Sequence, residues 1–150
     1  MSLLRRTLCL VPVLAALSCN SLETGPDEER LTILTAVDKF TLGLNETVAI
    51  TVTVHNVGIE PLVLTGPSDC LIYIEVRDTD GDRPYTSASQ CSGSTVTEEI
   101  APGAERHQSF VWDGNANSGN RVPSGHYLLR PIVRLSTGAR PGLGEQITVE

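Results

Sequence analysis

The only tryptophan of the chain stands at the end of an alternating segment, and a glycine-rich connection follows it directly. Over residues 107–113, Phe110 and Trp112 fall on the same side of an extended strand, which predicts that this side faces a core. The connection over residues 113–125 holds glycines, asparagines and a proline, which tight irregular turns require. A buried tryptophan removes on the order of 150–250 Å² from water, about 4–6 kcal/mol as an upper bound. We therefore expect the fold to be organised around Trp112.

The rest of the chain reads as short extended segments separated by turn signals. Residues 47–56 give the clearest pattern, because side chains alternate and β-branched residues recur at every second position, which disfavours a helix. About eight or nine such strands in 150 residues predict one all-β domain, an antiparallel β-sandwich. Pro131 cannot donate to a ladder, so its strand is expected to lie at an edge or to bulge there. The other expected strands are residues 31–37, 62–64, 70–77, 96–100, 107–113, 127–135 and 146–149.

A motif spread over the last third of the chain carries a family resemblance. Its members are Pro102, Gly103, Phe110, Trp112, Asp113, Gly114, Gly119, Val122, Pro123, Gly125 and Tyr127. Together they resemble the closing motif of the intracellular proteinase inhibitor family of the BsuPI type, which implies an Ig-like β-sandwich. Residues 48–76 fall where the opening strands of that family do, so the resemblance spans about the last hundred residues. A shorter form of the motif recurs in Ig-like repeats of unrelated function, including the flagellar hook-capping protein, so it indicates the fold more than inhibition.

The amino end has the parts of a bacterial export signal over residues 1–18. Two arginines precede an apolar run at residues 8–17 that is too short for a permanent transmembrane helix, and a small residue precedes Cys19. Residues 16–19 resemble a lipobox, which implies acylation of Cys19 and membrane anchoring. An ordinary secretory signal with a coincidental cysteine is the alternative. Asn20 after the cysteine, by resemblance to sorted lipoproteins, favours the outer membrane, facing the periplasm or the cell surface.

Charge and composition predict a tether after the export signal and an acidic surface on the domain. Residues 19–30 are polar and acidic and contain Gly25 and Pro26, which predicts a flexible tether ahead of a domain over residues 31–150. The formal charge is −7, and removal of the export segment makes the chain two charges more negative. Such an acidic surface repels phosphate backbones, so nucleic acid is not an expected partner.

Four cysteines are present, and two of them lie in or at the end of the export signal. Cys9 leaves with the signal and an acylated Cys19 has no free thiol, so Cys70 and Cys91 remain as a pair in an oxidising compartment. We expect them to form a disulfide worth about 3 kcal/mol. A zinc site is not expected, because two cysteines at this spacing lack histidine partners.

Two acidic loops raise the question of calcium. The loop at residues 78–82 holds three aspartates around a glycine, yet it lacks the glycine and glutamate positions of an EF-hand loop, and the loop at residues 113–120 lacks them too. A hairpin turn is expected at residues 78–82, with weak calcium binding as the alternative. His55 is expected to be a cross-strand or solvated residue. No metal or cofactor is predicted.

No activated nucleophile is evident in the sequence, because no serine lies in a G-x-S-x-G turn and Ser124 reads as a turn residue. We therefore predict a protein that is not an enzyme: an envelope lipoprotein whose Ig-like domain binds a protein partner. The alternative implied by the resemblance is inhibition of subtilisin-like serine proteases through an exposed loop. Residues 85–95 are polar and small, and we expect an exposed loop there, tied down by the disulfide and available for binding.

Overall fold

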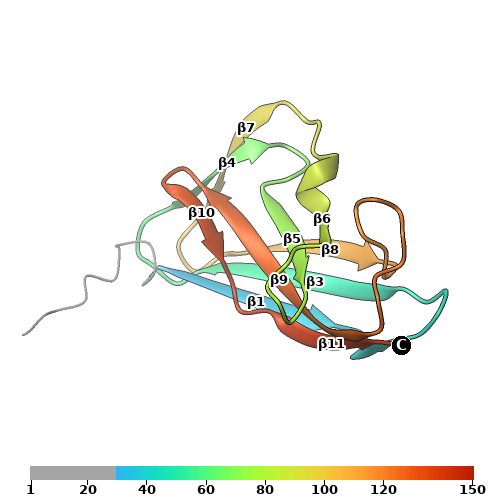
Figure 1. Cartoon of the computed structure of the whole chain (residues 1–150). Coiled ribbons are helices and arrows are strands. Elements are labelled where there is room, and N and C mark those ends of the chain that lie inside the picture. Colours follow the sequence, from blue (N-terminus) through green and yellow to red (C-terminus); the bar gives the residue numbers. More distant parts are fainter. Residues whose placement is uncertain (1–29) are drawn as a thin grey trace, which may run out of the picture.

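The computed structural model describes residues 30–150, and these residues form two β-sheets stacked face to face (Figure 1). The first sheet has three antiparallel strands in the order β1 (Leu31–Val37), β3 (Val48–Asn56) and β8 (Glu105–Trp112). The expected export segment, the lipidation site Cys19 and all but the last residue of the expected tether lie outside the described residues.

The second sheet is built around one long central strand, β9 (Gly125–Leu135). One edge of β9 pairs with β4 and β5, and the other edge pairs with β10 and β11. All of these pairings are antiparallel, whereas β2 pairs with β11 in parallel. The remaining strands of this sheet are β2 (Thr41–Leu42), β4 (Leu62–Pro67), β5 (Ile72–Arg77), β6 (Tyr85–Thr86), β7 (Thr95–Ile100), β10 (Gly138–Pro141) and β11 (Glu145–Val149).

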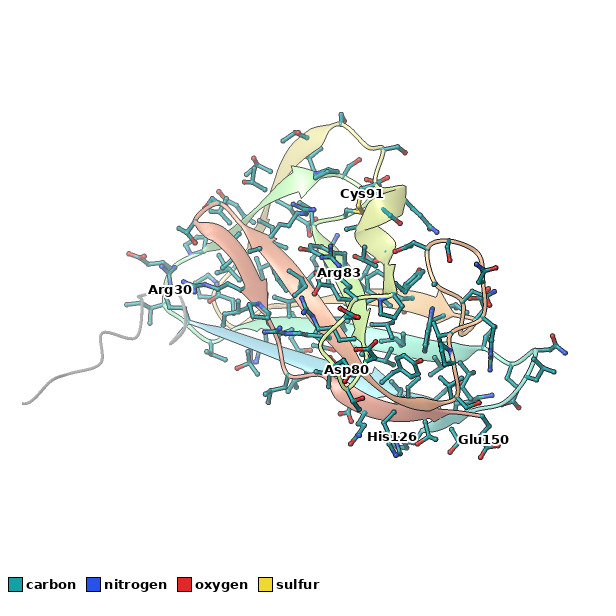
Figure 2. The ribbon with its side chains drawn as sticks, in the orientation of Figure 1. Arg30, Asp80, Arg83, Cys91, His126 and Glu150 are labelled. Carbon is teal, nitrogen blue, oxygen red and sulfur yellow. A yellow bond between two sulfur atoms is a disulfide. The ribbon has the colours of Figure 1, made fainter. Side chains whose placement is uncertain are left out.

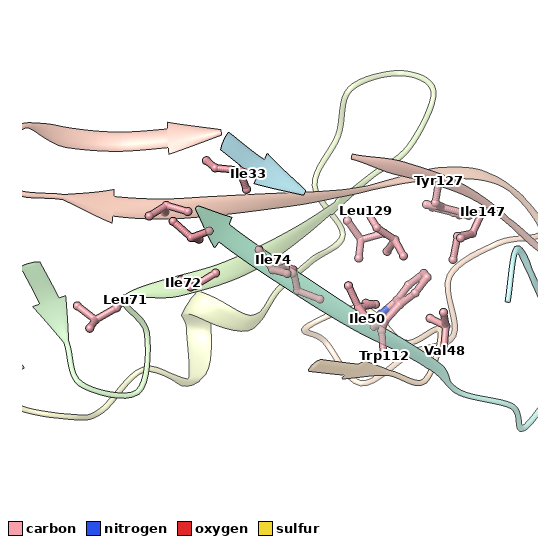
Figure 3. Packing of buried hydrophobic residues seen from close by; sticks show 14 of the residues in the cluster. Ile33, Val48, Ile50, Leu71, Ile72, Ile74, Trp112, Tyr127, Leu129 and Ile147 are labelled. Carbon is pink, nitrogen blue, oxygen red and sulfur yellow. The ribbon is translucent and has the colours of Figure 1, made fainter. Parts of the chain in front are cut away.

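The core lies between the sheets and follows the alternation of the strands. In β3 the even-numbered side chains from Val48 to Val54 are fully buried, while Ala49 and Thr51 face solvent. Figure 3 shows Ile50 of β3 and Trp112 of β8 packed toward Leu129 of β9. The apolar core residues all lie between Ile33 and Val149.

The all-β sandwich is confirmed, and the structure refines its details. It has eleven strands in place of the expected eight or nine, partly because β2 and β6 have only two residues each. The strand expected at residues 62–64 continues to Pro67, and the one expected from residue 70 begins at Ile72. Alternation does not identify two-residue strands, since they are too short to show a period.

Pro131 lies in the central strand β9, yet its strand has a local edge at this position, in line with the expectation of an edge or a bulge there. It is paired with Ile74 of β5 on one side. On the other side, β10 ends at Pro141 and β11 starts at Glu145, so no described strand pairs with Pro131 there. The missing backbone N–H of Pro131 therefore leaves no ladder bond unmade. The Pro131 carbonyl accepts from the Gly142 N–H at 2.9 Å. The proline is tolerated because its neighbouring strand is interrupted.

Within residues 30–150, no helix is long and apolar enough to cross a membrane.

Candidate functional site

The region that we call the tryptophan corner comprises residues 112–127. The Trp112 side chain is 1% exposed, and its indole Nε1–H donates to the Asn115 carbonyl at 2.8 Å. Its ring packs edge-on against Tyr127, with centroids 6.0 Å apart, and against Tyr85, with centroids 6.2 Å apart. The Tyr127 hydroxyl donates to the Pro123 carbonyl at 2.8 Å, back across the turn. The indole N–H of Trp112 and the hydroxyl of Tyr127 therefore each have a hydrogen-bond partner.

Arg121 fastens this corner to β2. Its guanidinium donates to the Asp113 carbonyl at 2.8 Å and to the Gly43 carbonyl at 2.8 Å. Gly114 has a φ of +76°, and a Cβ there would collide with the Arg121 guanidinium, so this position needs glycine. The sequence did not single out Arg121, because its carbonyl partners at the end of β2, Leu42 and Gly43, lie far away in the chain.

The residues of the family motif lie at turns and in the core. Gly103 and Gly119 have φ values of +74° and +86°, and the Gly103 N–H donates to the Asn56 carbonyl at 2.8 Å. Phe110 packs against the core at its margin, and Val122 is buried. Asp113 accepts from the Asn115 backbone N–H at 3.0 Å. These contacts give the motif a structural role.

A second region, the stapled segment, comprises residues 68–94. Cys70 and Cys91 are joined in a disulfide, as the cysteine count predicts, with their Cα atoms 5.8 Å apart. Beside it, the Asp69 carboxylate accepts from the backbone N–H groups of Ser92 at 2.9 Å and Gly93 at 3.0 Å. The bond from Ser92, aided by that from Gly93, holds the pKa of Asp69 below its ordinary value.

The first half of the part of this segment expected to be an exposed loop, residues 85–95, has regular structure. It begins with the short strand β6 and continues as a 3₁₀ helix, η1 (Ser87–Gln90). Thr86 caps η1 by accepting from the Ala88 N–H, and the Ser87 hydroxyl accepts from the Ile74 N–H at 3.0 Å. The expectation of a loop was wrong for residues 85–90, because small polar residues supply caps and short-range bonds that hydrophobic periodicity does not reveal, whereas residues 91–94 form a loop at the disulfide.

Asn117 joins the stapled segment to the tryptophan corner. Its side-chain carbonyl accepts from the Thr86 N–H at 2.8 Å, and its amide donates to the Thr86 carbonyl at 3.1 Å and to the Ser89 hydroxyl at 2.8 Å. Its backbone N–H also donates to the Pro84 carbonyl at 2.9 Å. One side chain thus bonds to Thr86 as a neighbouring strand would, and two loops that are separate in the sequence become one surface.

The hollow between these two loops is the candidate binding surface, and we call it the loop cluster. It is an open cavity of about 490 Å³ lined by Tyr85, Ser89, Gln90, Asp113, Asn115, Ala116, Asn117 and Gly119. Most of these side chains carry hydroxyl, amide or carboxylate groups. Burial raises the pKa of Tyr85, and the nearby Asp113 charge adds to the effect, so the Tyr85 hydroxyl stays neutral and able to donate. Such a lining suits recognition through hydrogen bonds.

The loop at residues 78–82 is a turn, as expected. The Asp78 carboxylate accepts from the backbone N–H groups of Asp80 at 3.0 Å and Asp82 at 2.9 Å, and Gly81 has a φ of +88°. Within residues 30–150, no group of three or more His, Cys, Asp or Glu side chains is arranged to hold a metal ion.

Below this loop lies Glu75, a carboxylate that the sequence did not single out. It is 4% exposed and accepts from Arg77 at 2.8 Å and from Arg83 at 2.7 Å. Burial acts to raise the pKa of Glu75, but the hydrogen bonds from Arg83 and Arg77 outweigh it and hold the pKa below the ordinary value. Strand alternation would put Glu75 on the solvent side, yet it is buried with Arg77 and Arg83 both bonded to its carboxylate.

The histidines lie in strands, as expected. His55 faces Glu105 across the β3 and β8 ladder, with Nδ1 and Oε1 3.9 Å apart. His107 lies 3.5 Å from the same carboxylate and shares a hydrogen bond with Thr53 at 3.0 Å. His126 makes a 3.2 Å contact with Thr148. The exposed Ser124 lies in a turn between Pro123 and Gly125, so neither chain neighbour could activate its hydroxyl as an acid or a base.

Comparison with known proteins supports the fold. No family model matches the chain, and no curated protein matches its sequence. Among solved structures, it is similar to part of a β-glucosidase from Erythrobacter marinus, at 16% identity over 80% of this chain and 15% of that one, with a TM-score of 0.51.

Two further structures are similar in the same way. One is the alkylpurine DNA glycosylase AlkC of Pseudomonas fluorescens, at 11% identity over 81% of this chain and 30% of that one, with a TM-score of 0.52. The other is the sporulation control protein Spo0M of Bacillus subtilis, at 16% identity over 81% of this chain and 49% of that one, with a TM-score of 0.52. This chain spans less than half of each of these proteins. At such identities the likeness is one of fold alone: the chain has a β-sandwich found within larger proteins that differ from one another.

Proposed function

We propose that this chain is an exported, non-catalytic lipoprotein of the bacterial envelope, anchored through Cys19, whose Ig-like domain binds another protein through the loop cluster. Export rests on the sequence of residues 1–18, and the outer membrane on Asn20 after the cysteine. The Cys70–Cys91 disulfide supports it, because disulfides persist in compartments outside the cytoplasm. No cofactor, metal or nucleic acid takes part in this proposal.

The observation that carries the binding role is the Asn117 clasp between two loops. Its hydrogen bonds, together with the disulfide, hold the loop cluster in one shape before any partner arrives. A surface fixed in advance loses less conformational entropy on binding. The described chain starts at Arg30, away from the stapled segment marked by Cys91 (Figure 2). A tether leaving from Arg30 would keep the loop cluster clear of the anchor.

Inhibition of a subtilisin-like protease remains the alternative that the resemblance implies. An inhibitor of this kind commonly presents an extended, rigid segment to the protease cleft. The stapled segment is rigid, but η1 is helical between Ser87 and Gln90, and Asn117 covers one of its sides. This geometry favours binding of a protein surface over insertion into a cleft, and purified protein is expected not to slow subtilisin. A tight stoichiometric block would instead establish the inhibitor.

The anchor is tested in the cell. Replacement of Cys19 by Ala is expected to release the protein from membranes or to block its processing, because the acylated sulfur is lost. Retention of a mature Cys19→Ala protein in the membrane fraction would refute the lipoprotein assignment.

The binding surface is tested by crosslinking in envelope extracts. A photo-crosslinking residue at Gln90, on the loop cluster, is expected to capture one discrete partner. The matched control is the same residue at Glu60, which pairs with Arg30 at 3.3 Å where the described chain begins. Equal capture from both positions, or none from Gln90, would contradict the proposed surface.

A further inference from the structure

The edges of the two sheets differ in how they are protected. An exposed strand edge invites pairing with another chain, and proteins usually block it with charges, proline, bulges or covering loops. The β1 edge is covered by residues 142–144, where the Thr35 hydroxyl donates to the Leu143 carbonyl at 3.0 Å. The β7 edge carries two consecutive glutamates, Glu98 and Glu99. Strand β8 pairs only with β3 among the described strands, so its other edge is open.

The residues that present this open edge follow from the ladder. In an antiparallel pair, successive residues direct their N–H and C=O groups to opposite neighbours. The Asn56 N–H donates to the Ala104 carbonyl at 3.0 Å, so residues of β8 an even number of positions from Ala104 bond to β3. The alternate residues direct their N–H and C=O groups outward, and they are Glu105, His107, Ser109 and Val111. Their row is about 20 Å long.

Little blocks this row. The register between β3 and β8 runs without a break from Val48 opposite Trp112 to His55 opposite Glu105, so there is no bulge. The strand contains neither proline nor lysine, and Val111 is 63% exposed. The only carboxylate on the outer face of the strand is Glu105, at its beginning. The second half of β8 therefore offers unpaired N–H and C=O groups to which another strand could bond.

We propose that a second copy of this chain completes the sheet, with the two β8 strands pairing antiparallel about a twofold axis at Gln108. This register uses all four outward residues of each copy. Glu105 of one copy faces Val111 of the other, and His107 faces Ser109. The two three-stranded sheets become one six-stranded sheet, and the interface is isologous.

The side chains of β8 are complementary to themselves in this register. On the outer face, no charge lies opposite a like charge, since Glu105 meets an apolar residue. On the inner face, Arg106 meets Phe110 of the other copy, and a guanidinium beside an aromatic ring is attractive. Arg106 also bonds to Glu98 of β7, in the other sheet, at 2.6 Å. A second copy thus satisfies both the backbone and the side chains.

The test measures self-association of a fragment of residues 20–150, which retains every core residue described above. A single strand pair is a small interface, so the dissociation constant is expected on the order of 0.1–1 mM. Analytical ultracentrifugation over that concentration range should give a monomer–dimer equilibrium. Hydrogen exchange followed by NMR should protect the N–H groups of Glu105, His107, Ser109 and Val111 only at high concentration. The N–H groups of Gln108 and Phe110, bonded to β3, should be protected throughout.

A charge swap tests the register itself. Val111→Glu puts a carboxylate opposite Glu105 of the other copy at two symmetric places, and it should weaken the dimer about tenfold. Adding Glu105→Lys should restore association to at least the original strength. A second measurement, circular dichroism on heating, checks that both variants are folded. Monomers up to about 1 mM with fast exchange at all four outward N–H groups would overturn the proposal. Val111→Glu that dimerises like the original protein would overturn it too.

Discussion

The tryptophan corner and the stapled segment meet at Asn117, yet they are held in different ways. The corner closes through contacts between near neighbours, such as Trp112 with Asn115 and Tyr127 with Pro123. The stapled segment depends on contacts between distant residues, such as Cys70 with Cys91 and Thr86 with Asn117. One surface therefore combines a loop closed largely by local hydrogen bonds with a loop closed by a disulfide and by bonds to distant residues.

The largest expected effect is in the corner. Trp112→Ala removes the largest fully buried side chain and should destabilise the domain by about 3–5 kcal/mol in chemical denaturation followed by circular dichroism. Trp112→Phe keeps an aromatic ring and should cost less, although it leaves the Asn115 carbonyl without its donor. If Trp112→Ala cost under about 1 kcal/mol, the corner would not be the organising element.

The disulfide comes next. Replacing Cys70 and Cys91 together by Ser should cost about 3 kcal/mol, because the unfolded chain regains freedom over 21 residues. Amide exchange should rise mainly over residues 87–94, while the N–H of Tyr127 stays protected. An equal rise of amide exchange in residues 87–94 and at Tyr127 would show that the two regions open together.

Asn117→Ala should have a smaller effect, about 1–2 kcal/mol, since it removes the side-chain bonds to Thr86 and Ser89. The Thr86 N–H is expected to exchange faster. Asn120→Ala is the matched control in the same loop, where the side chain makes one long contact of 3.5 Å with Ser118. Equal losses of stability and equal Thr86 N–H exchange in the two variants would show that the Asn117 side chain does not hold the loop cluster together.

The smallest effect concerns pH. The pKa of Asp69 is lowered in the folded protein by the Ser92 bond, so its stabilisation is present above the ordinary aspartate value, about 4. It is lost as the pH falls through the lower folded value. Thermal melting should therefore show a small acid-dependent loss of stability that Asp69→Asn reduces. An unchanged pH profile in Asp69→Asn would assign the loss to other carboxylates.

The same contrast explains what the sequence could predict. The strands with a clear period of two, above all β3, and the burial of Trp112 follow from alternation, because one face of each strand must leave water. The disulfide follows from counting. Helix η1 and the burial of Glu75 could not be predicted, because they depend on short-range polar contacts that alternation does not reveal. The Asn117 clasp could not be predicted either, because its partners come together only after folding.

Pro131 illustrates the limit from the other direction. The rule that proline avoids central strands is sound, but it applies to a position whose neighbouring strand is continuous. Here residues 142–144 interrupt the strand beside Pro131, and the Gly142 N–H donates to the Pro131 carbonyl. The rule places Pro131 at a local edge, but it does not reveal that the strand itself is central, because the interruption is created by another segment.

The position of Trp112 also makes the molecule its own optical probe. The indole contacts Tyr127, within the corner (Figure 3), and Tyr85, within the stapled segment. Because it is the only tryptophan, all indole emission comes from the point where the two regions touch. Two tyrosines within about 6 Å can transfer excitation energy to it, each from one region. Fluorescence excited through tyrosine therefore distinguishes a protein with both regions closed from one in which the stapled segment has opened while the corner persists.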